Sequence, residues 1–206
     1  MYSTFPPART FVVPEQADDG AEGQRRPGFF RGVATVVTKL LNAVQPDRAY
    51  FGQKDGYQCI VVRQLARDLL LPTDIRIRPT VREQDGLAMS SRNAYLSEQQ
   101  RRAAPALYRG LQLVAESVQK LGSLPPGGRD GLMQMLRGEL DASGGEFRNI
   151  EYLDLACALT GRPIDRLEDS QGRGGAVLLS AAVRIGETRL IDNIVLRGGA
   201  DDLGAA

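Results

Sequence analysis

The sequence predicts an α/β protein in which part of a doubly wound, Rossmann-like domain is followed by a small α+β domain. Helical and strand-like segments alternate between residues 32 and 78, which is the pattern of a parallel sheet covered by helices. Beyond residue 95, helices come first and strand-like segments come last, an order typical of an α+β unit. A chain of 206 residues is long enough for one domain and a smaller second one.

Two helices and two strands are expected in the first part. In chain order they are a helix over 32–44, a strand over 48–51, a helix over 55–70 and a strand over 74–78. The first helix carries an apolar stripe from Val33 to Val44, and Pro46 ends it. These strands are too few for a complete doubly wound domain, so we expect the segment to be the later half of one.

The residues before Gly32 are expected to be irregular. Pro6, Pro7 and Pro14 interrupt regular structure, and the polar, glycine-containing run 16–24 is typical of a flexible loop. We therefore expect no helix or strand in this segment.

The second part is expected to open with a long helix. Ser97 and Gln100 are spaced as a capping box, and the apolar periodicity that follows predicts a helix continuing to about Leu121. In chain order, the remaining segments are a loop over 123–130, a helix over 132–140 and strands over 150–155, 176–185 and 188–196. Gly186 and Glu187 predict a hairpin turn between the last two strands. The tail after Arg197 is expected to fray.

Charge and composition exclude several classes of function. The formal net charge of +1 argues against broad binding to nucleic acid or acidic membranes. No apolar run approaches the roughly 18 residues of a membrane span. Cys59 and Cys157 are in no metal-ligand spacing, so we expect reduced thiols in a cytoplasmic protein. The chain has no histidine, which excludes Ser-His and Cys-His hydrolase mechanisms within it.

The first loop that could bind an anion is Gly52-Gln53-Lys54-Asp55, which lies where a strand passes into a helix. Ligands of parallel α/β sheets bind beyond the carboxyl ends of the strands. A lysine there can neutralise phosphate, and Gly52 lets the backbone approach closely. The alternative is that Lys54 and Asp55 form a solvated pair in a turn.

A second such loop follows the next strand and contains Ser90-Ser91-Arg92. Hydroxyls, backbone N–H groups and a forked guanidinium suit the oxygens of a triphosphate. Val81 and Arg82, just upstream, could edge the same pocket. The alternative is a serine-rich turn with an exposed arginine.

Gln58 is expected near the first turn of the second helix, on the side that faces the same crevice. Its amide offers a donor and an acceptor, which suits a hydroxy-acid substrate. Glutamines are also common on surfaces, so a solvated side chain is the alternative.

These motifs resemble those of one enzyme family. The segments RPGFFRGV (26–33), FGQKD (51–55), PTVRE (79–83), DGLAMSSRNAYLS (85–97) and RLIDN (189–193) together resemble pantothenate synthetase, the pantoate–β-alanine ligase. The resemblance covers nearly the whole chain and is densest over residues 26–108.

The resemblance implies a nucleotidyltransferase-type ATP- and pantoate-binding domain, here residues 1–92, followed by a small lid domain, residues 93–206. It implies a two-step reaction. The pantoate carboxylate attacks the α-phosphorus of ATP to give pantoyl-adenylate and pyrophosphate, and the amine of β-alanine then displaces AMP. Mg²⁺ accompanies the nucleotide, and family members are usually homodimers.

The resemblance also assigns roles to individual residues. The positions that match the family's ATP contacts are Gly52, Gln53, Lys54, Asp55, Val81, Met89, Ser90, Ser91 and Arg92. Within that set, the expected catalytic residues are Lys54, Ser90, Ser91 and Arg92. Lys54 is the main phosphate-neutralising group, and Gln58 matches the pantoate-binding glutamine. No residue is assigned as a metal ligand.

The chain departs from the family pattern in several places. Gln53 stands where glutamate is commoner, Gly56-Tyr57 replaces an aromatic residue followed by glutamine, and Phe29 occupies a position that is often histidine. Family members also carry a first half, with a His-x-Gly-His motif, before the segment that starts at Met1. The chain is therefore expected to be either an enzyme sequence cut short or a remnant that binds nucleotide without chemistry. A different nucleotidyltransferase-like ligase is disfavoured, because Gln58 and the SSRN context fit pantoate.

Overall fold

The computed structural model describes residues 10–15 and 17–205. Its helices and strands are, in chain order, α1 (Ala21–Arg25), α2 (Phe29–Val44), β1 (Arg48–Gly52), α3 (Gly56–Asp68), β2 (Asp74–Arg78), α4 (Glu98–Ala103), α5 (Ala106–Leu121), α6 (Gly128–Ala142), β3 (Phe147–Cys157), β4 (Val177–Ile185) and β5 (Thr188–Leu196). Short 3-10 turns connect some of them, among them η1 (Gln53–Asp55), η2 (Ser91–Tyr95) and η5 (Ala200–Asp202).

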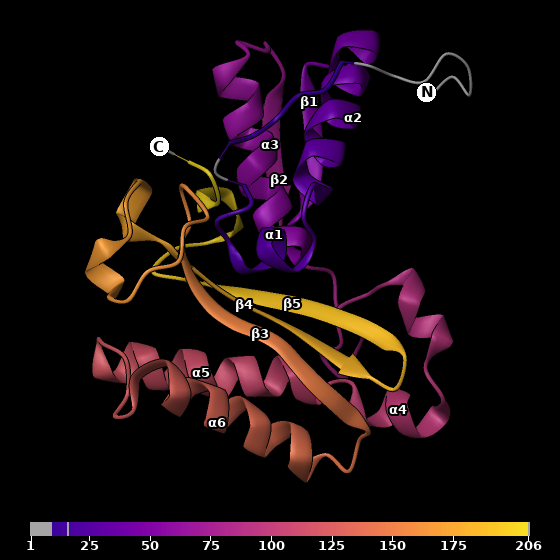
Figure 1. Ribbon diagram of the computed structural model, residues 1–206, viewed down its shortest axis with the longest axis vertical. Coiled ribbons are helices and arrows are strands. Elements are labelled where there is room, and N and C mark those ends of the chain that lie inside the picture. Colours follow the sequence, from indigo (N-terminus) through magenta and orange to yellow (C-terminus); the bar gives the residue numbers. More distant parts are fainter. Residues whose placement is uncertain (1–9, 16, 206) are drawn as a thin grey trace.

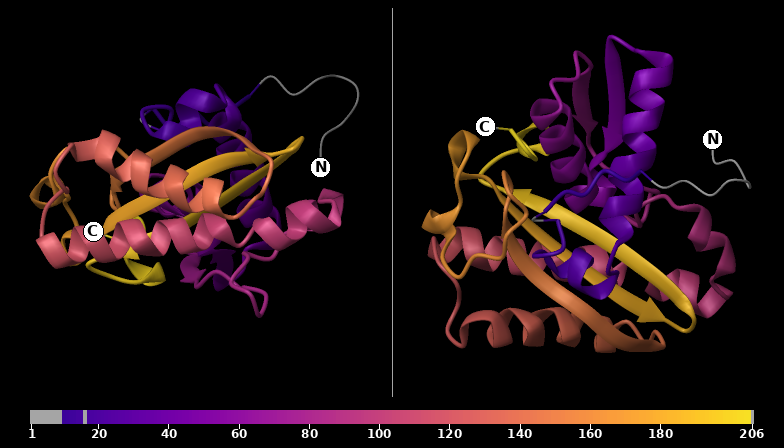
Figure 2. Two further views of the ribbon diagram at one scale, coloured as in Figure 1. Left: turned by 90° about the horizontal axis from the view of Figure 1, so that it is seen from below. Right: turned by 45° about the horizontal axis from the view of Figure 1, so that its top comes forward.

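Two sheets organise the chain. Strands β1 and β2 pair in parallel, with Arg48 opposite Asp74, and α2 and α3 pack beside them. Strands β3, β4 and β5 form an antiparallel sheet in that order. Figure 1 shows this second sheet as a middle layer, with α5 and α6 below it and the α1–α3 unit above it. The views in Figure 2 show the same layering.

The antiparallel sheet is buried on both faces because its side chains alternate between two cores. On β4 and β5, Leu179 and Leu190 belong to a core shared with α5 and α6. Leu178, next to Leu179 on β4, and Val195, its partner on β5, belong to the core shared with α2 and α3. Alternation with a period of two is the geometry of any strand, so adjacent residues of this sheet contact different layers of the molecule.

The α/β prediction is confirmed, and several element bounds agree closely. The predicted strand over 74–78 is β2, and the predicted strand over 188–196 is β5. Its hairpin partner β4 meets β5 through Gly186 and Glu187, as predicted. Ser97 and Gln100 form the predicted capping box. Both cysteines are free and buried.

The prediction of an irregular segment before Gly32 was wrong in part. Residues 21–25 form α1, and α2 begins at Phe29. The stripe on α2 is also only partly covered, since Leu40 is 42% and Val44 67% exposed. Pro6, Pro7 and Gln16 lie outside the described residues.

The long helix predicted from Ser97 to Leu121 is divided into α4 and α5. Pro105 lies at the break and serves as the N-cap of α5, because proline lacks the N–H that a continuous helix requires. The prediction of a frayed tail was also wrong: Leu203 is fully buried, and Gly204 donates a backbone hydrogen bond to Ala158. Within the described residues, no helix is long and apolar enough to cross a membrane.

Candidate functional site

The first predicted loop is the turn η1 between β1 and α3. The side chain of Asn193, on β5, donates to the carbonyl oxygens of Gln53 at 2.8 Å and Lys54 at 3.0 Å. Its own amide oxygen accepts from Gln53 Nε2 at 3.1 Å. The turn therefore gets its shape from a strand about 140 residues further along the chain.

Gly56 lets the turn approach the antiparallel sheet. A Cβ at this position would lie 2.9 Å from Leu178 Cδ1 and 3.2 Å from Asn193 Nδ2. Gly56 has ordinary helical torsion angles, so its requirement is space rather than backbone freedom. The close approach holds the start of α3, with Gln58 on its first turn, against β4 and β5.

Lys54 joins the two predicted loops. Its Nζ donates to the carbonyl oxygen of Met89 at 3.3 Å. Partial burial lowers the pKa of Lys54, and the charge of Arg92 lowers it further, while Asp55 and Asp192 act in the opposite direction. The lysine thus lies within the field of charges from both loops and from β5.

The second predicted loop runs from β2 to α4, and its own polar groups make several of the hydrogen bonds within it. Gly86 has a φ of 91°, a conformation that favours glycine. Ser90 Oγ accepts from the backbone N–H of Arg92 at 3.2 Å, and Asn93 Nδ2 donates to the carbonyl oxygen of Ala88 at 3.1 Å. The serine hydroxyl therefore caps the turn η2 that follows.

The two loops line one open cleft of about 410 Å³. Its predicted members are Lys54, Asp55, Gln58, Ser90 and Arg92. The remaining lining residues, which the sequence had not placed at the site, are Arg26, Phe29, Arg189 and Ile191. Four cationic side chains consequently line a single space, which favours an anionic ligand.

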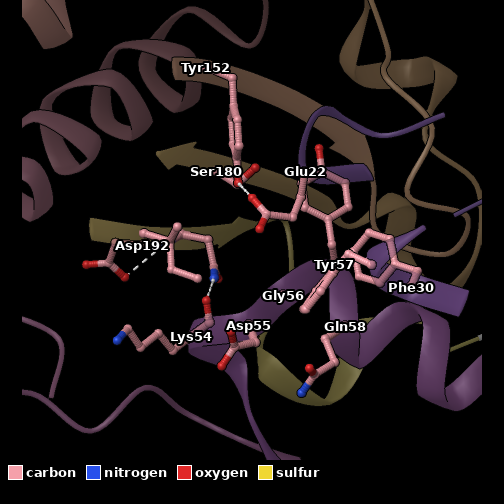
Figure 3. Close-up of a pocket in the computed structure, with 13 residues that line it drawn as sticks. Glu22, Phe30, Lys54, Asp55, Gly56, Tyr57, Gln58, Tyr152, Ser180 and Asp192 are labelled. Carbon is pink, nitrogen blue, oxygen red and sulfur yellow. Dashed lines mark hydrogen bonds between the residues drawn. The ribbon is translucent and has the colours of Figure 1, made fainter. Parts of the chain in front are cut away.

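A deeper pocket of about 20 Å³, room for about one water molecule, adjoins this cleft and shares Lys54, Asp55 and Gln58 with it. Figure 3 shows these three residues on one side of the pocket, with Glu22 and Tyr152 on the other. The space that can hold a ligand is therefore the basic cleft, and the deeper pocket is the closely packed wall beside it.

Some predicted site residues lie outside both pockets. Gly52, Gln53, Val81, Met89 and Ser91 line neither of them. Val81 is 68% and Met89 55% exposed. Their backbones are nevertheless joined within the second loop, because the N–H of Met89 donates to the carbonyl oxygen of Val81 at 2.9 Å. Gln53 contributes through its bonds to Asn193.

The wall opposite Lys54 contains an ion pair that sequence reasoning missed. Glu22 is 5% exposed and accepts from Arg189 Nη2 at 2.6 Å and from the Tyr152 hydroxyl at 3.0 Å. Burial alone would raise the pKa of Glu22, but the hydrogen bonds and charge of Arg189 outweigh it and hold the pKa below its ordinary value. Arg189 also bonds to Glu151 at 2.7 Å. Arg189 lies in the RLIDN motif, which the sequence analysis identified. Its partner Glu22 lies in a segment that was expected to be irregular, so the pair was not predicted.

A second missed contact supports the start of α3 from behind. The hydroxyl of Tyr57 donates to Asp154 Oδ2 at 2.6 Å, and Arg129 Nη1 donates to Asp154 Oδ1 at 2.8 Å. Burial, followed by the charge of Asp154, raises the pKa of Tyr57 well above its ordinary value. Tyr57 therefore stays protonated and acts as a hydrogen-bond donor.

Comparisons with known proteins identify the family to which the chain belongs. The family model described as pantoate-beta-alanine ligase matches residues 1–195. A pantothenate synthetase of Chloroflexus aurantiacus is 50% identical over 197 residues, covering 94% of this chain and 66% of the relative. One of Pseudomonas entomophila is 46% identical, covering 95% of this chain and 64% of the relative. The chain thus spans about two thirds of the length of these relatives.

Solved structures give the same result. The pantothenate synthetase of Thermus thermophilus superposes with a TM-score of 0.77 at 42% identity, covering 94% of this chain and 65% of that one. A pantoate-beta-alanine ligase from Francisella tularensis, complexed with beta-gamma ATP and beta-alanine, superposes with a TM-score of 0.64 at 26% identity, covering 95% of this chain and 61% of that one. On the family match, the sequence identity and the shared fold, the chain belongs to the pantoate–β-alanine ligase family.

Proposed function

We propose that the chain catalyses the ATP-dependent condensation of pantoate with β-alanine, through a pantoyl-adenylate, to give pantothenate, AMP and pyrophosphate. The observation that supports this most directly is the meeting of two loops in one basic cleft, where Lys54 contacts the backbone of Met89. Phosphate charge is best stabilised by fixed cationic groups and hydrogen-bond donors. Family membership supplies the substrates.

In the first step, a carboxylate oxygen of pantoate attacks the α-phosphorus of ATP, and pyrophosphate leaves with the bonding electron pair. We assign Lys54 and Arg92, with Ser90 and Ser91, to the phosphate oxygens, where charge increases during this step. Gln58 is assigned to pantoate, because its amide can donate to a carboxylate and accept from a hydroxyl.

In the second step, the neutral amine of β-alanine attacks the acyl carbon of the adenylate. AMP leaves with the electron pair of the C–O bond, and the amine loses a proton as the amide forms. Asp55 lines both the cleft and the deeper pocket, so we place it beside the incoming amine and the nucleotide. The backbone of Gly52, Gln53, Val81 and Met89 completes the proposed nucleotide contacts.

Mg²⁺ is proposed to enter with the nucleotide. Among the described residues, no cluster of three or more His, Cys, Asp or Glu side chains could hold a metal ion. Mg²⁺ in nucleotide enzymes is usually held by substrate phosphates, waters and one or two carboxylates, and Asp55 fits that limited requirement. The ion would neutralise phosphate charge during adenylate formation.

The family also suggests an organisation for the whole protein. We propose that residues 1–92 bind ATP and pantoate, that residues 93–206 form the lid, and that the protein is a cytoplasmic homodimer. Light scattering after size-exclusion chromatography would give the mass of the particle, and a monomer would contradict the dimer.

The function is tested by pantoate-dependent exchange of labelled pyrophosphate into ATP. Exchange that requires pantoate, together with formation of pantothenate when β-alanine is added, is the expected result. Calorimetric binding of ATP without any exchange would contradict the ligase and favour the alternative, a nucleotide-binding chain without chemistry.

A further inference from the structure

The C-terminal strand β5 contacts both loops of the cleft through two neighbouring residues. Asp192 is 3% and Asn193 2% exposed, so neither meets solvent appreciably. Successive residues of a strand point to opposite faces. Asp192 shares its face with Leu190, in the core with α5 and α6, whereas Asn193 shares its face with Val195, in the core with α2 and α3.

Asn193 reaches the first loop. Its side chain makes three hydrogen bonds with η1, donating to the carbonyl oxygens of Gln53 and Lys54 and accepting from the side chain of Gln53. A side-chain amide is suited to this position because it donates and accepts at once. The bonds orient the peptide that carries Lys54.

Asp192 reaches the second loop. It accepts two hydrogen bonds from Arg82, from Nη1 at 2.5 Å and from Nη2 at 2.9 Å. The same Arg82 donates to the carbonyl oxygen of Gly86 at 3.0 Å and lies over the ring of Tyr108 on α5, 3.5 Å from its centroid. A bidentate pair of this kind fixes the orientation of the guanidinium as well as its position.

These two sets of contacts are linked to each other. Asp192 Oδ1 accepts from the backbone N–H of Asn193 at 2.8 Å, and Lys54 Nζ connects the loops themselves by bonding to Met89. Neither Asp192 nor Asn193 lines the basic cleft; both line only the deeper pocket. Their contacts therefore act on the loops rather than on a ligand in the cleft.

We propose that Asp192 and Asn193 are positioning residues that set the geometry of the two nucleotide loops, Asn193 for residues 52–56 and Asp192 for residues 81–93. The C-terminal sheet then acts as the template against which both loops are shaped before any ligand binds. That these loops bind a nucleotide rests on the proposed function, but the positioning role of Asp192 and Asn193 does not.

Isosteric substitutions separate positioning from space-filling. Asn193→Asp keeps the shape of the side chain but replaces the donor with an acceptor facing two carbonyl oxygens. Asp192→Asn keeps the shape but removes the charge that pairs with Arg82. Thr73→Val is the matched control: Thr73 is 6% exposed, and its hydroxyl bonds to the carbonyl oxygen of Pro46 at 2.9 Å, at the opposite end of β2 from the loops.

Amide hydrogen exchange on the full, ligand-free chain is the test. In Asn193→Asp we expect at least tenfold faster exchange in peptides covering 52–56. In Asp192→Asn we expect the same increase in peptides covering 81–93. Thr73→Val should leave both loops unchanged relative to the wild type. Unchanged exchange in both loops of both variants would overturn the proposal, as would an increase spread evenly over the chain.

Nucleotide affinity provides a second measurement. ATP titrated calorimetrically should bind at least tenfold more weakly to Asn193→Asp than to Thr73→Val. If the wild type binds ATP, equal affinity in these two variants would contradict the positioning role of Asn193. A wild type that shows loop protection but no pyrophosphate exchange would contradict the proposed ligase while leaving the positioning role intact.

Discussion

The side-chain amide of Asn193 donates to the carbonyl oxygen of Lys54 at 3.0 Å, so the lysine at the end of a parallel strand is held by an antiparallel strand from the other end of the chain. Hydrogen bonds to backbone carbonyls orient a peptide without engaging its side chain. Lys54 is thereby left to reach the cleft and the carbonyl oxygen of Met89.

Replacing Lys54 with alanine should weaken ATP binding by about 10- to 100-fold, because a charge-assisted contact with phosphate contributes about 1.5–3 kcal/mol. Arg92→Ala should weaken it less, since Arg92 lies exposed on the second loop. Calorimetric titration of ATP measures both. Lys120→Ala, at the exposed end of α5, is the control for loss of one positive charge. Equal affinity in the wild type and Lys54→Ala would contradict the role given to this lysine.

Replacing Gly56 with alanine should destabilise the fold by about 1–3 kcal/mol, the usual range for overpacking a tight core. The added methyl group would meet Leu178 at 2.9 Å. Gly32→Ala on α2 is the matched control, because nothing lies within 4 Å of its Cβ position; there alanine should stabilise the helix by about 0.5–1 kcal/mol. Urea denaturation compares the two. A Gly56→Ala variant as stable as the wild type would show that the sheet can move away.

Replacing Tyr57 with phenylalanine should lower the free energy of unfolding by about 1–3 kcal/mol, because it leaves one oxygen of the buried Asp154 without its donor. Arg129 still holds the other oxygen, which limits the loss. Tyr95→Phe, at a ring that is 79% exposed, should change little. If urea denaturation gave Tyr57→Phe and Tyr95→Phe the same free energy of unfolding, the Tyr57 hydroxyl would make no net contribution to stability.

The ion pair of Glu22 and Arg189 should make stability depend on pH in a defined direction. The folded-state pKa of Glu22 is held below its ordinary value of 4.5, so folding favours the ionised form. Its stabilising contribution is complete above the unfolded-state pKa and disappears as the pH falls through the folded-state pKa.

Glu22→Gln should therefore cost about 3 kcal/mol near pH 7, as expected when one partner of a buried ion pair is removed, and progressively less below about pH 4.5. Denaturation curves at a series of pH values measure this difference. Glu116→Gln, on an exposed position of α5, provides the reference for loss of a carboxylate. A stability difference that grew as the pH fell would contradict the assignment.

Local signals in the sequence identified much of the fold. Strand β2, the capping box at Ser97 and the β4–β5 hairpin follow from alternation, hydrogen-bonding side chains and turn residues, all of which act over a few positions. The division at Pro105 also had a local cause, but the apolar periodicity on both sides concealed it. Helix α1 has no apolar periodicity that could have predicted it. Its tertiary contact is the ion pair of Glu22 with the distant Arg189, which no local pattern reveals.

The sequence by itself determined which segments carry Lys54, Gln58, Ser90 and Arg92, because residue type and placement after a strand are local properties. Only the tertiary structure decided that these loops meet, that Glu22 and Arg189 form the facing wall, and that Asp192 and Asn193 hold both loops. Those contacts join segments 35 to 167 residues apart. Which residues meet in these contacts depends on how the layers of the molecule pack together. The spacing of residues along the chain does not predict it.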